Sequence, residues 1–508
     1  ENLTFTLTDG VGGTVALRGF DKDYDLVMDS VELKMKTNPN DPSDFPHAEP
    51  VPFDSPVLEK KAGWLKGDLH VKSVHGGGAE SVAELVKRAE QSGLDFIAIT
   101  DRNTMDACFD ADFKSNKVVL IPAMEWGNEQ RGMALIYGPR TMPEITNSFK
   151  EDQGVCQRVQ AQGGIFVVAT PCFPTAPWQR GLSYVNGIEV WCRDYRAVPG
   201  IKLENLVEEY QRKVDGKLIY SISMAANTQD LSANGQATMF WDYELTRGLK
   251  AACVAGSMSS SPKVPMGKPI TYVYAPEKSV RGILYGLRMG RTTIAADADA
   301  PTIEFYTDVR SWKSNAETAQ AAINNTLDPN AKAAPQQAVK VGKPEISLGG
   351  IVPLGMPVDL YLEVKNAKGM KMEILRNGWP IVTKKIETDK VELLKTTDTP
   401  NAYCNYRARV IRAPQAKGIG PVDVVAMTSP IYAQDIVPID PTKKNPLDIN
   451  IRVDKPGAAP PAKVSEVVEE GGKKRVRFEN GAPVQPVQPD NFNLPPDAKV
   501  NTLKPKKL

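Results

Sequence analysis

The stretch GWLKGDLHVKSVHGGG, residues 63–78, contains the residue types of a metal-binding loop. His70 ends a strand-like run, and Lys72 stands two residues later, where a second imidazole would complete a chelating pair. A protonated lysine has no lone pair to offer a cation. The stretch therefore raises two alternatives: an enzyme with altered chemistry, or the fold of an enzyme without its reaction.

Histidine is scarce in this chain. The 508 residues include three histidines, His47, His70 and His75. Hydrolase centres with two or three metal ions use several imidazole ligands, so little is left here to build one. The six cysteines are scattered, and their spacing does not predict a zinc finger. We interpret them as small buried hydrophobic residues, with a Cys172–Cys192 disulfide as an option if the protein is exported.

Length and composition set the class of protein. With 508 residues, 41% of them hydrophobic, the chain can fill the cores of about two to four domains. The formal net charge of +1 argues against a dedicated nucleic-acid-binding protein. No apolar run reaches the length of a membrane span. The sequence begins with Glu1, which slightly favours removal of a signal peptide, and hence export to the periplasm or the extracellular space, over trimming of the chain.

The elements that must position these residues alternate between strands and helices. Residues 1–62 contain the strand-like runs NLTFTLTD and SVELKMK, which predict a small β element, and end in a proline-rich linker. Over residues 63–310, apolar runs such as DFIAIT, KVVLIPAMEW, GGIFVVAT and GIEVWC alternate with helices of about three turns. The alternation predicts an α/β fold, a mainly parallel sheet or barrel with functional groups at the carboxyl ends of its strands.

Two of the helices have clear boundaries in the sequence. SVAELVKRAEQSG begins with Ser81 and carries Glu84 three residues later, which is the spacing of a capping box, and Gly93 follows its end. SVRGILYGLRMG begins with Ser279 and ends at Gly290. The apolar residues of the first segment fall on one face, so we predict an amphipathic helix that packs against the sheet.

Farther along the chain the pattern changes twice. Residues 311–345 are rich in Ala, Asn and Gln and lack an apolar face, which predicts a linker or a surface insertion. Residues 346–435 alternate with a period of two, and MEILRNGWPIV centres on Asn377-Gly378, the pair that a type I′ hairpin favours. This pattern predicts a small β-sandwich. Residues 436–508 are rich in Pro and Lys and cannot bury a core of their own, which predicts an extended tail.

Seven motifs follow one another in an order that resembles the PHP (polymerase and histidinol phosphatase) superfamily of metal-dependent phosphoesterases. They are GDLHV, GLDFIAITDRNT, IPAMEW with RGMALIYG, GGIFVVATP, NGIEVW, VAGSMSS and GLRMGRTTIA. GWLKGDLHV and AMTSPIYA are similar to the CehA/McbA-type metallohydrolase branch. The resemblance covers about residues 60–435. It implies a distorted (β/α)7 barrel that carries up to three metal ions at the carboxyl ends of its strands.

The resemblance also places the metal ligands of that family on this sequence, and most of them are replaced. His70, Asp101 and Glu125 keep side chains of the ligand type, and His75 is a further candidate. The other ligand positions hold residues that do not bind metals in such centres: Lys72, Arg102, Met133, Thr170, Met258 and Ser260. One imidazole, a doubtful second and one bridging carboxylate do not make a closed coordination shell, so we expect no metal or other cofactor.

The replacements suggest repair of a vacated site. Lys72 and Arg102 bring positive charge to the place that cations occupy in the family, next to Glu125. A buried carboxylate without its metal is costly unless it is paired, and a lysine or arginine relieves that cost. Met133 and Met258 fill space without requiring hydrogen bonds. We therefore predict that Lys72 or Arg102 lies within salt-bridge distance of Glu125.

Three functional hypotheses follow. The first is a catalytically inactive PHP-fold protein, a pseudoenzyme that serves as a structural or binding subunit of a larger assembly. The second is a divergent hydrolase of phosphate or other esters that keeps one weak metal at His70 and Glu125 or uses Lys72 and Arg102 to hold an anion. The third is a module that binds a small anion through Lys72 and Arg102.

The expected partners are other protein subunits, in a homo- or hetero-oligomer, contacted through residues 436–508. A tail without its own core is ordered only on another surface, because each ordered residue costs about 1–2 kcal/mol of backbone entropy. We expect INIRV and KKRVRFEN to add as strands to an exposed sheet edge. No nucleic acid and no membrane span are expected.

Overall fold

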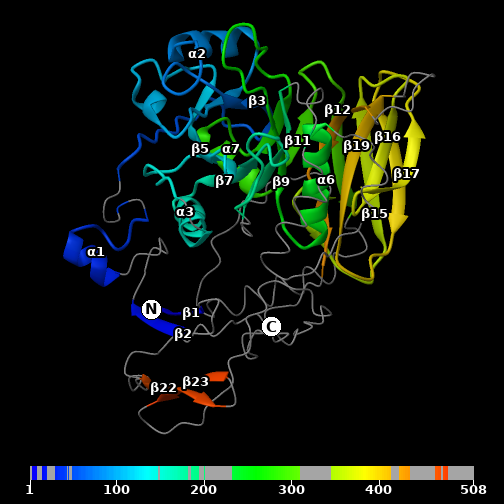
Figure 1. The fold of residues 1–508 in the computed structure, drawn as a ribbon. Helices are drawn as coiled ribbons and strands as arrows, with labels where there is room; N and C mark the ends of the chain where they lie inside the picture. Colours follow the sequence, from blue (N-terminus) through cyan, green and yellow to red (C-terminus); the bar gives the residue numbers. More distant parts are fainter. Residues whose placement is uncertain are drawn as a thin grey trace, which may run out of the picture. The chain divides into compact units, whose positions relative to one another are not determined.

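The computed structural model divides the chain into two compact units. One unit is Glu49–Pro438, and the other combines Glu1–Ala48 with Ile439–Leu508. Figure 1 colours both along the sequence. The structure describes residues 3–8, 14–19, 29–42, 44, 49–146, 149–180, 185–193, 200, 232–308, 345–412, 423–434, 464–470 and 473–478. The predicted linker of residues 311–345 therefore lies outside the described residues, apart from its last one.

The smaller unit contains two hairpins and one helix among its described residues. β1 (Leu3–Thr8) pairs antiparallel with β2 (Thr14–Gly19), and β22 (Val464–Glu470) pairs antiparallel with β23 (Lys473–Phe478). β23 contains the KKRVRF sequence that was expected to add to an exposed sheet edge; its described pairing is with β22. The segment INIRV lies outside the described residues.

One predicted strand of this unit is wrong. The run SVELKMK belongs to helix α1 (Asp29–Met35). Glu, Leu, Lys and Met are strong helix formers, and the acidic side chains of Asp29 and Glu32 in the first turn favour a helix N-terminus. The apparent alternation of apolar residues does not mark a buried face, because Leu33 and Met35 are exposed.

The larger unit is built on one sheet of 15 described strands. Its first part runs in the order β3-β4-β5-β6-β7-β8-β9. β3, β4 and β5 are parallel, β6 is antiparallel to both of its neighbours, and β7, β8 and β9 are parallel again. The bounds are β3 Gly63–Val71, β4 Phe96–Ile99, β5 Val119–Asn128, β6 Gly132–Tyr137, β7 Ile165–Ala169, β8 Gly187–Cys192 and β9 Ala252–Gly256.

This row of strands is not a closed barrel, which corrects the prediction. A single bridge, Val71 to Ser259, links the ends of the row, and β3 instead forms a ladder with β10 (Ile270–Ala275). From β10 the sheet continues through β11 (Thr292–Ala295) to β20 (Asp423–Thr428). The edge of β3 is thus paired with a late strand, and this pairing carries the sheet into the C-terminal part of the chain.

The two helices with predicted boundaries are confirmed, and two further helices also pack on this sheet. α2 (Val82–Gln91) has the predicted capping box, since the Ser81 side chain accepts from the backbone of Glu84 and the Glu84 side chain accepts from the backbone of Ser81. α7 (Val280–Arg288) is capped by Ser279 and packs on β10. α3 (Phe149–Ala161) packs on β7, and α6 (Ala233–Thr246) packs on β8. None of the described helices is long and apolar enough to cross a membrane.

The C-terminal part of the larger unit adds a second sheet of four strands, in the order β13-β12-β15-β18. Leu360 and Leu362 of its β15 share a hydrophobic core with Ile374 of β16 and Tyr406 of β19. Figure 1 shows β15, β16 and β19 close together. The predicted hairpin is confirmed, because β16 and β17 meet at Asn377-Gly378 and both residues have a positive φ. The bounds are β12 Thr302–Asp308, β13 Glu345–Ile346, β14 Ile351–Val352, β15 Val358–Lys365, β16 Lys371–Arg376, β17 Trp379–Lys385, β18 Glu392–Asp398, β19 Cys404–Arg412 and β21 Ile431–Ala433.

A β-sandwich remains a prediction for this region. The sheet that carries β16 and β19 also carries β3 to β11, so part of the predicted sandwich belongs to the same hydrogen-bonded sheet as the predicted barrel. All six cysteines of the chain are buried and none forms a disulfide, so the optional Cys172–Cys192 disulfide is absent.

Candidate functional site

The end of β3 is shaped by a buried carboxylate. The backbone N–H groups of His70 and Ser257 donate to one oxygen of Asp68, at 3.1 and 3.0 Å. The Ser257 hydroxyl and the Gly267 N–H donate to the other oxygen, at 2.5 and 2.7 Å. The pairing of β3 with β4 shifts register between Asp68 and Val71. Such an irregularity re-aims side chains at a strand end, and here it directs His70 into the protein.

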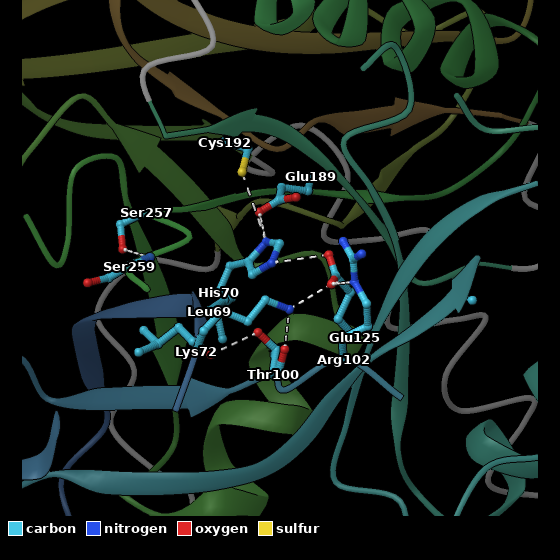
Figure 2. Close-up of polar contacts among 12 residues, drawn as sticks. Leu69, His70, Lys72, Thr100, Arg102, Glu125, Glu189, Cys192, Ser257 and Ser259 are labelled. Atoms are coloured by element: carbon cyan, nitrogen blue, oxygen red, sulfur yellow. Dashed lines mark hydrogen bonds and ion pairs between the residues drawn. The ribbon is translucent and has the colours of Figure 1, made fainter. Parts of the chain in front are cut away.

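His70 lies between two carboxylates and is fully buried (Figure 2). Its Nδ1 is 2.9 Å from Oε1 of Glu189, and its Nε2 is 3.5 Å from Oε1 of Glu125. The second contact lacks hydrogen-bond geometry, which leaves Nε2 without a hydrogen-bond partner. Burial alone lowers the pKa of His70, but the charge of Glu189 and the contact with Glu125 outweigh it and raise that pKa to about 9. The imidazole is therefore held as a cation.

Lys72 binds the carboxylate of Glu125, as the sequence predicted. Its Nζ donates to Oε2 of Glu125 at 2.7 Å and to the carbonyl oxygen of Thr100 at 2.5 Å. The Nε of Arg102 donates to the same Glu125 oxygen at 3.2 Å. The predicted salt bridge is thus confirmed for both cations. Burial raises the pKa of Glu125, but Lys72 and His70 outweigh it, so the pKa lies well below its usual range and the group stays ionised.

The side chains of two other predicted positions have their partners outside this cluster. Asp101 is buried, but both of its oxygens accept from Ser73, one from the backbone N–H at 2.7 Å and one from the hydroxyl at 2.5 Å. His75 is exposed, and its Nε2 pairs with Asp110 at 3.1 Å. Asp101 therefore fixes the loop after β3, and His75 serves as a surface residue of that loop.

The other predicted positions, Met133, Thr170, Met258 and Ser260, lie in or close to the ends of β6, β7 and β9. Met133 is buried in the core at the start of β6, and Met258 packs against Cys192. The backbone carbonyl of Ser260 accepts from Ala79. Thr170 follows the end of β7 with a φ of 39°. These residues shape the loops at the carboxyl ends of the strands.

Those loops share a strained backbone. Asn103, Thr170, Arg193 and Met258 are non-glycine residues with φ values of 54°, 39°, 44° and 50°, and they follow β4, β7, β8 and β9. Left-handed conformations cost about 1–3 kcal/mol each and gather at functional sites of proteins. The ends of these four strands thus share a backbone geometry that is uncommon outside functional sites.

Sequence reasoning missed Glu189 and Cys192. Glu189 lies on β8 and orients His70, and Cys192 ends the same strand with its Sγ 4.0 Å from Nδ1 of His70. A signal was present, because Glu189 is the one charged residue in the apolar run GIEVWC. A charge within a fully buried strand requires a partner, and that requirement could have directed attention to His70.

The residues present do not fit the multi-metal centre that the resemblance implies. An ammonium group holds Oε2 of Glu125, and Ser73 holds both oxygens of Asp101. On the side of His70 that faces Glu125, two donor atoms remain for a metal ion: Nε2 of His70 and Oε1 of Glu125. Both lie beside the positive charges of Lys72 and Arg102. Two donors among cations cannot close a coordination shell for two or three divalent ions.

The comparisons with known proteins give weak likenesses. No protein-family model and no curated protein match the chain. It is similar to the crystal structure of a two-domain protein containing a predicted PHP-like metal-dependent phosphoesterase from Bacteroides vulgatus ATCC 8482, at 15% identity and a TM-score of 0.33, over 73% of this chain and 95% of that one. A CARDB domain from Pyrococcus furiosus matches 16% of this chain and 85% of its own length, at 13% identity and a TM-score of 0.12. At these TM-scores neither likeness supports a functional assignment.

Proposed function

We propose that this chain is a non-catalytic protein of the PHP type that acts as a structural or binding subunit. The observation that carries the proposal is the contact between Lys72 Nζ and Glu125 Oε2, at 2.7 Å and buried. A metal ion at Glu125 would have to displace an ammonium group that the protein itself supplies. The sequence motifs support the PHP type, and the ion pairs support the loss of the metal-dependent reaction.

The charges of the cluster make the vacated site stable. Glu125 is ionised and has three cationic neighbours, His70, Lys72 and Arg102. A buried charge is tolerated when it is paired and hydrogen-bonded. These positive charges would repel a divalent cation, and the Glu125 carboxylate that could bind it is already paired.

Hydrolysis assays test the non-catalytic part of the proposal. The purified full chain is assayed with bis(p-nitrophenyl) phosphate and p-nitrophenyl acetate in the presence of Mn²⁺, Zn²⁺ or Fe²⁺. We expect no turnover above that of a His70→Ala variant, because neither protein can generate a metal-bound hydroxide at Glu125. Metal-dependent turnover that is lost in His70→Ala would overturn the proposal.

The subunit role is supported by the composition of residues 436–508, which cannot form a core of their own. A chain that ends at residue 435 keeps nearly all of the compact unit Glu49–Pro438. We expect it to remain folded and soluble but to lose the assembly that the full chain forms, as measured by light scattering. Assembly of the shortened chain at the level of the full chain would remove the support for this role.

A divergent hydrolase is the second candidate, favoured by one observation. Nε2 of His70 has no hydrogen-bond partner and faces Oε1 of Glu125 at 3.5 Å. One metal ion between these atoms would retain two ligands of the family, provided that Lys72 moves away from Glu125. Glu125→Gln distinguishes the candidates, since a hydrolase would lose activity while it stays folded, whereas a structural ion pair would lose stability.

A further inference from the structure

A second donor set lies on the other face of the His70 ring. Nδ1 of His70, a carboxylate oxygen of Glu189 and Sγ of Cys192 lie within 4.8 Å of one another, and all three residues are buried. In Figure 2 these three side chains converge, apart from Lys72 and Arg102. Two of the donors, Glu189 and Cys192, belong to none of the motif positions at which the sequence resemblance places a metal ligand.

An irregularity in β8 brings Glu189 and Cys192 to the same side. Residues three apart in a regular strand point to opposite faces of the sheet. The pairing of β8 with β9 shifts register between Glu189 and Trp191, which adds one residue and turns Cys192 back toward the face of Glu189. Gly256 of the neighbouring β9 allows His70 to lie close to this strand, because a Cβ at position 256 would collide with the Cβ of His70. The three donor residues thus come from two strands, His70 from β3 and the other two from β8.

The separations are close to those of a tetrahedral metal site. Bonds of about 2.0–2.3 Å to nitrogen, oxygen and sulfur place neighbouring donors roughly 3.3–3.8 Å apart. Here Nδ1 is 2.9 Å from the Glu189 oxygen and 4.0 Å from Sγ of Cys192. The other oxygen of Glu189 is buried and has no hydrogen-bond partner, so a lone pair is free. Small side-chain shifts would bring all three donors into range of one ion.

We propose that His70, Glu189 and Cys192 bind a single Zn²⁺-type cation through Nδ1, a carboxylate oxygen and Sγ. The thiolate selects Zn²⁺, Co²⁺ or Cd²⁺ over the oxygen-seeking Mg²⁺ and Mn²⁺. Binding displaces the thiol proton of Cys192 and the proton on Nδ1 of His70, and the charges of the carboxylate and the thiolate balance the ion. Three protein donors leave one position for water. The site is independent of the proposed function, since it requires neither hydrolysis nor a metal at Glu125.

The test uses Co²⁺ as a spectroscopic probe of the full chain. Because the donors are buried, the protein is unfolded, freed of metal with EDTA and refolded with Co²⁺. We expect one Co²⁺ per chain and a near-ultraviolet thiolate-to-cobalt charge-transfer band, which Zn²⁺ abolishes by displacement. A refolded chain that shows no such band and retains no metal would overturn the proposal.

Two cysteine variants locate the site. Cys192→Ser is expected to abolish the band and to weaken metal binding by about tenfold or more, because a thiolate ligand is lost. Cys172→Ser is the matched control, since Cys172 is also buried and free but lies outside the donor set. Retention of the band in Cys192→Ser, or its loss in Cys172→Ser, would contradict the assignment.

A measurement on the unmodified protein covers the case in which Cys192→Ser fails to fold. X-ray absorption spectroscopy of the zinc-loaded chain is expected to report one sulfur at about 2.3 Å with nitrogen and oxygen ligands at about 2.0–2.2 Å. A shell without sulfur would exclude Cys192 as a ligand. The hydrolysis assays described above are a separate readout, so this site and the proposed function can fail independently of each other.

Discussion

Two of the groups of buried ion pairs in the larger unit, one on β19 and one at the end of β3, are organised differently. On β19, Arg407 donates from Nε and Nη2 to the two oxygens of Asp242, at 2.8 and 2.6 Å, and Arg409 donates to Glu373 at 2.7 Å. Each arginine has its own carboxylate. At the end of β3, Glu125 instead serves three cationic neighbours at once.

The difference shows in the atoms that remain without partners. The carboxylate oxygens of Asp242 and Glu373 do not appear among the buried unpartnered atoms of the described residues, whereas Nε2 of His70 and one oxygen of Glu189 do. One-to-one ion pairs are sufficient for a structural role, because each buried charge is neutralised by its own partner. The cluster around His70 keeps unused donor and acceptor capacity, so Nε2 of His70 and one oxygen of Glu189 remain available to a ligand.

The largest effect should follow from breaking a one-to-one pair. Asp242→Asn leaves Arg407 buried with its full charge, since arginine cannot release its proton. We expect a loss of about 4 kcal/mol in the free energy of unfolding, measured by denaturant titration. Glu90→Gln, in the exposed pair with Lys117, is the control and should change little. An equally small loss for Asp242→Asn would show that this pair does not stabilise the fold.

The shared cluster should lose less when its central carboxylate is neutralised. Glu125→Gln is expected to cost about 3 kcal/mol, because His70 can deprotonate and the half-exposed Arg102 can turn toward water. Lys72 keeps its bond to the carbonyl of Thr100. The same titration measures the loss. A variant as stable as the parent that loses a measured hydrolysis would instead identify Glu125 as catalytic.

The pH dependence of stability should distinguish the shared cluster further. Folding raises the pKa of His70 from about 6.5 to about 9. The protonated imidazole therefore contributes fully to the free energy of unfolding below about pH 6.5, and this contribution is lost as the pH rises through about 9. For the metal-free protein we expect a decrease of about 2 kcal/mol from about pH 7 to about pH 9. His70→Asn should remove this part of the profile. An unchanged profile in the variant would contradict the assignment of the proton to His70.

The smallest effect is expected from restoring one family ligand. Lys72→His returns an imidazole next to Glu125, but Arg102, Met133, Thr170, Met258 and Ser260 still occupy ligand positions. The remaining shell cannot hold a metal tightly enough to form hydroxide at neutral pH. Phosphodiesterase assays with added Mn²⁺ should therefore show no gain. Metal-dependent turnover from this one change would show a site far less altered than the sequence indicates.

The sequence by itself determined the features that depend on near neighbours in the chain. The capping box of Ser81 and Glu84, the hairpin at Asn377-Gly378 and the apolar strands follow from local conformational preferences and periodicity. The pairing of Lys72 with Glu125 was also predictable, because the resemblance implies that Glu125 is buried and a buried carboxylate requires a cation such as Lys72. The prediction for SVELKMK failed because an alternating run of seven residues is compatible with a strand and with a helix.

Only the tertiary structure decided which distant residues meet. Glu189 and Cys192 reach His70 because register shifts in β8 and β3 re-aim their side chains, and such shifts depend on the pairing of whole strands. The pairing of whole strands also decides that the long sheet is open and continues from β3 into β10. Which strands pair depends on how the whole domain packs. A sequence pattern indicates that a strand is buried, but it does not indicate which strand lies next to it.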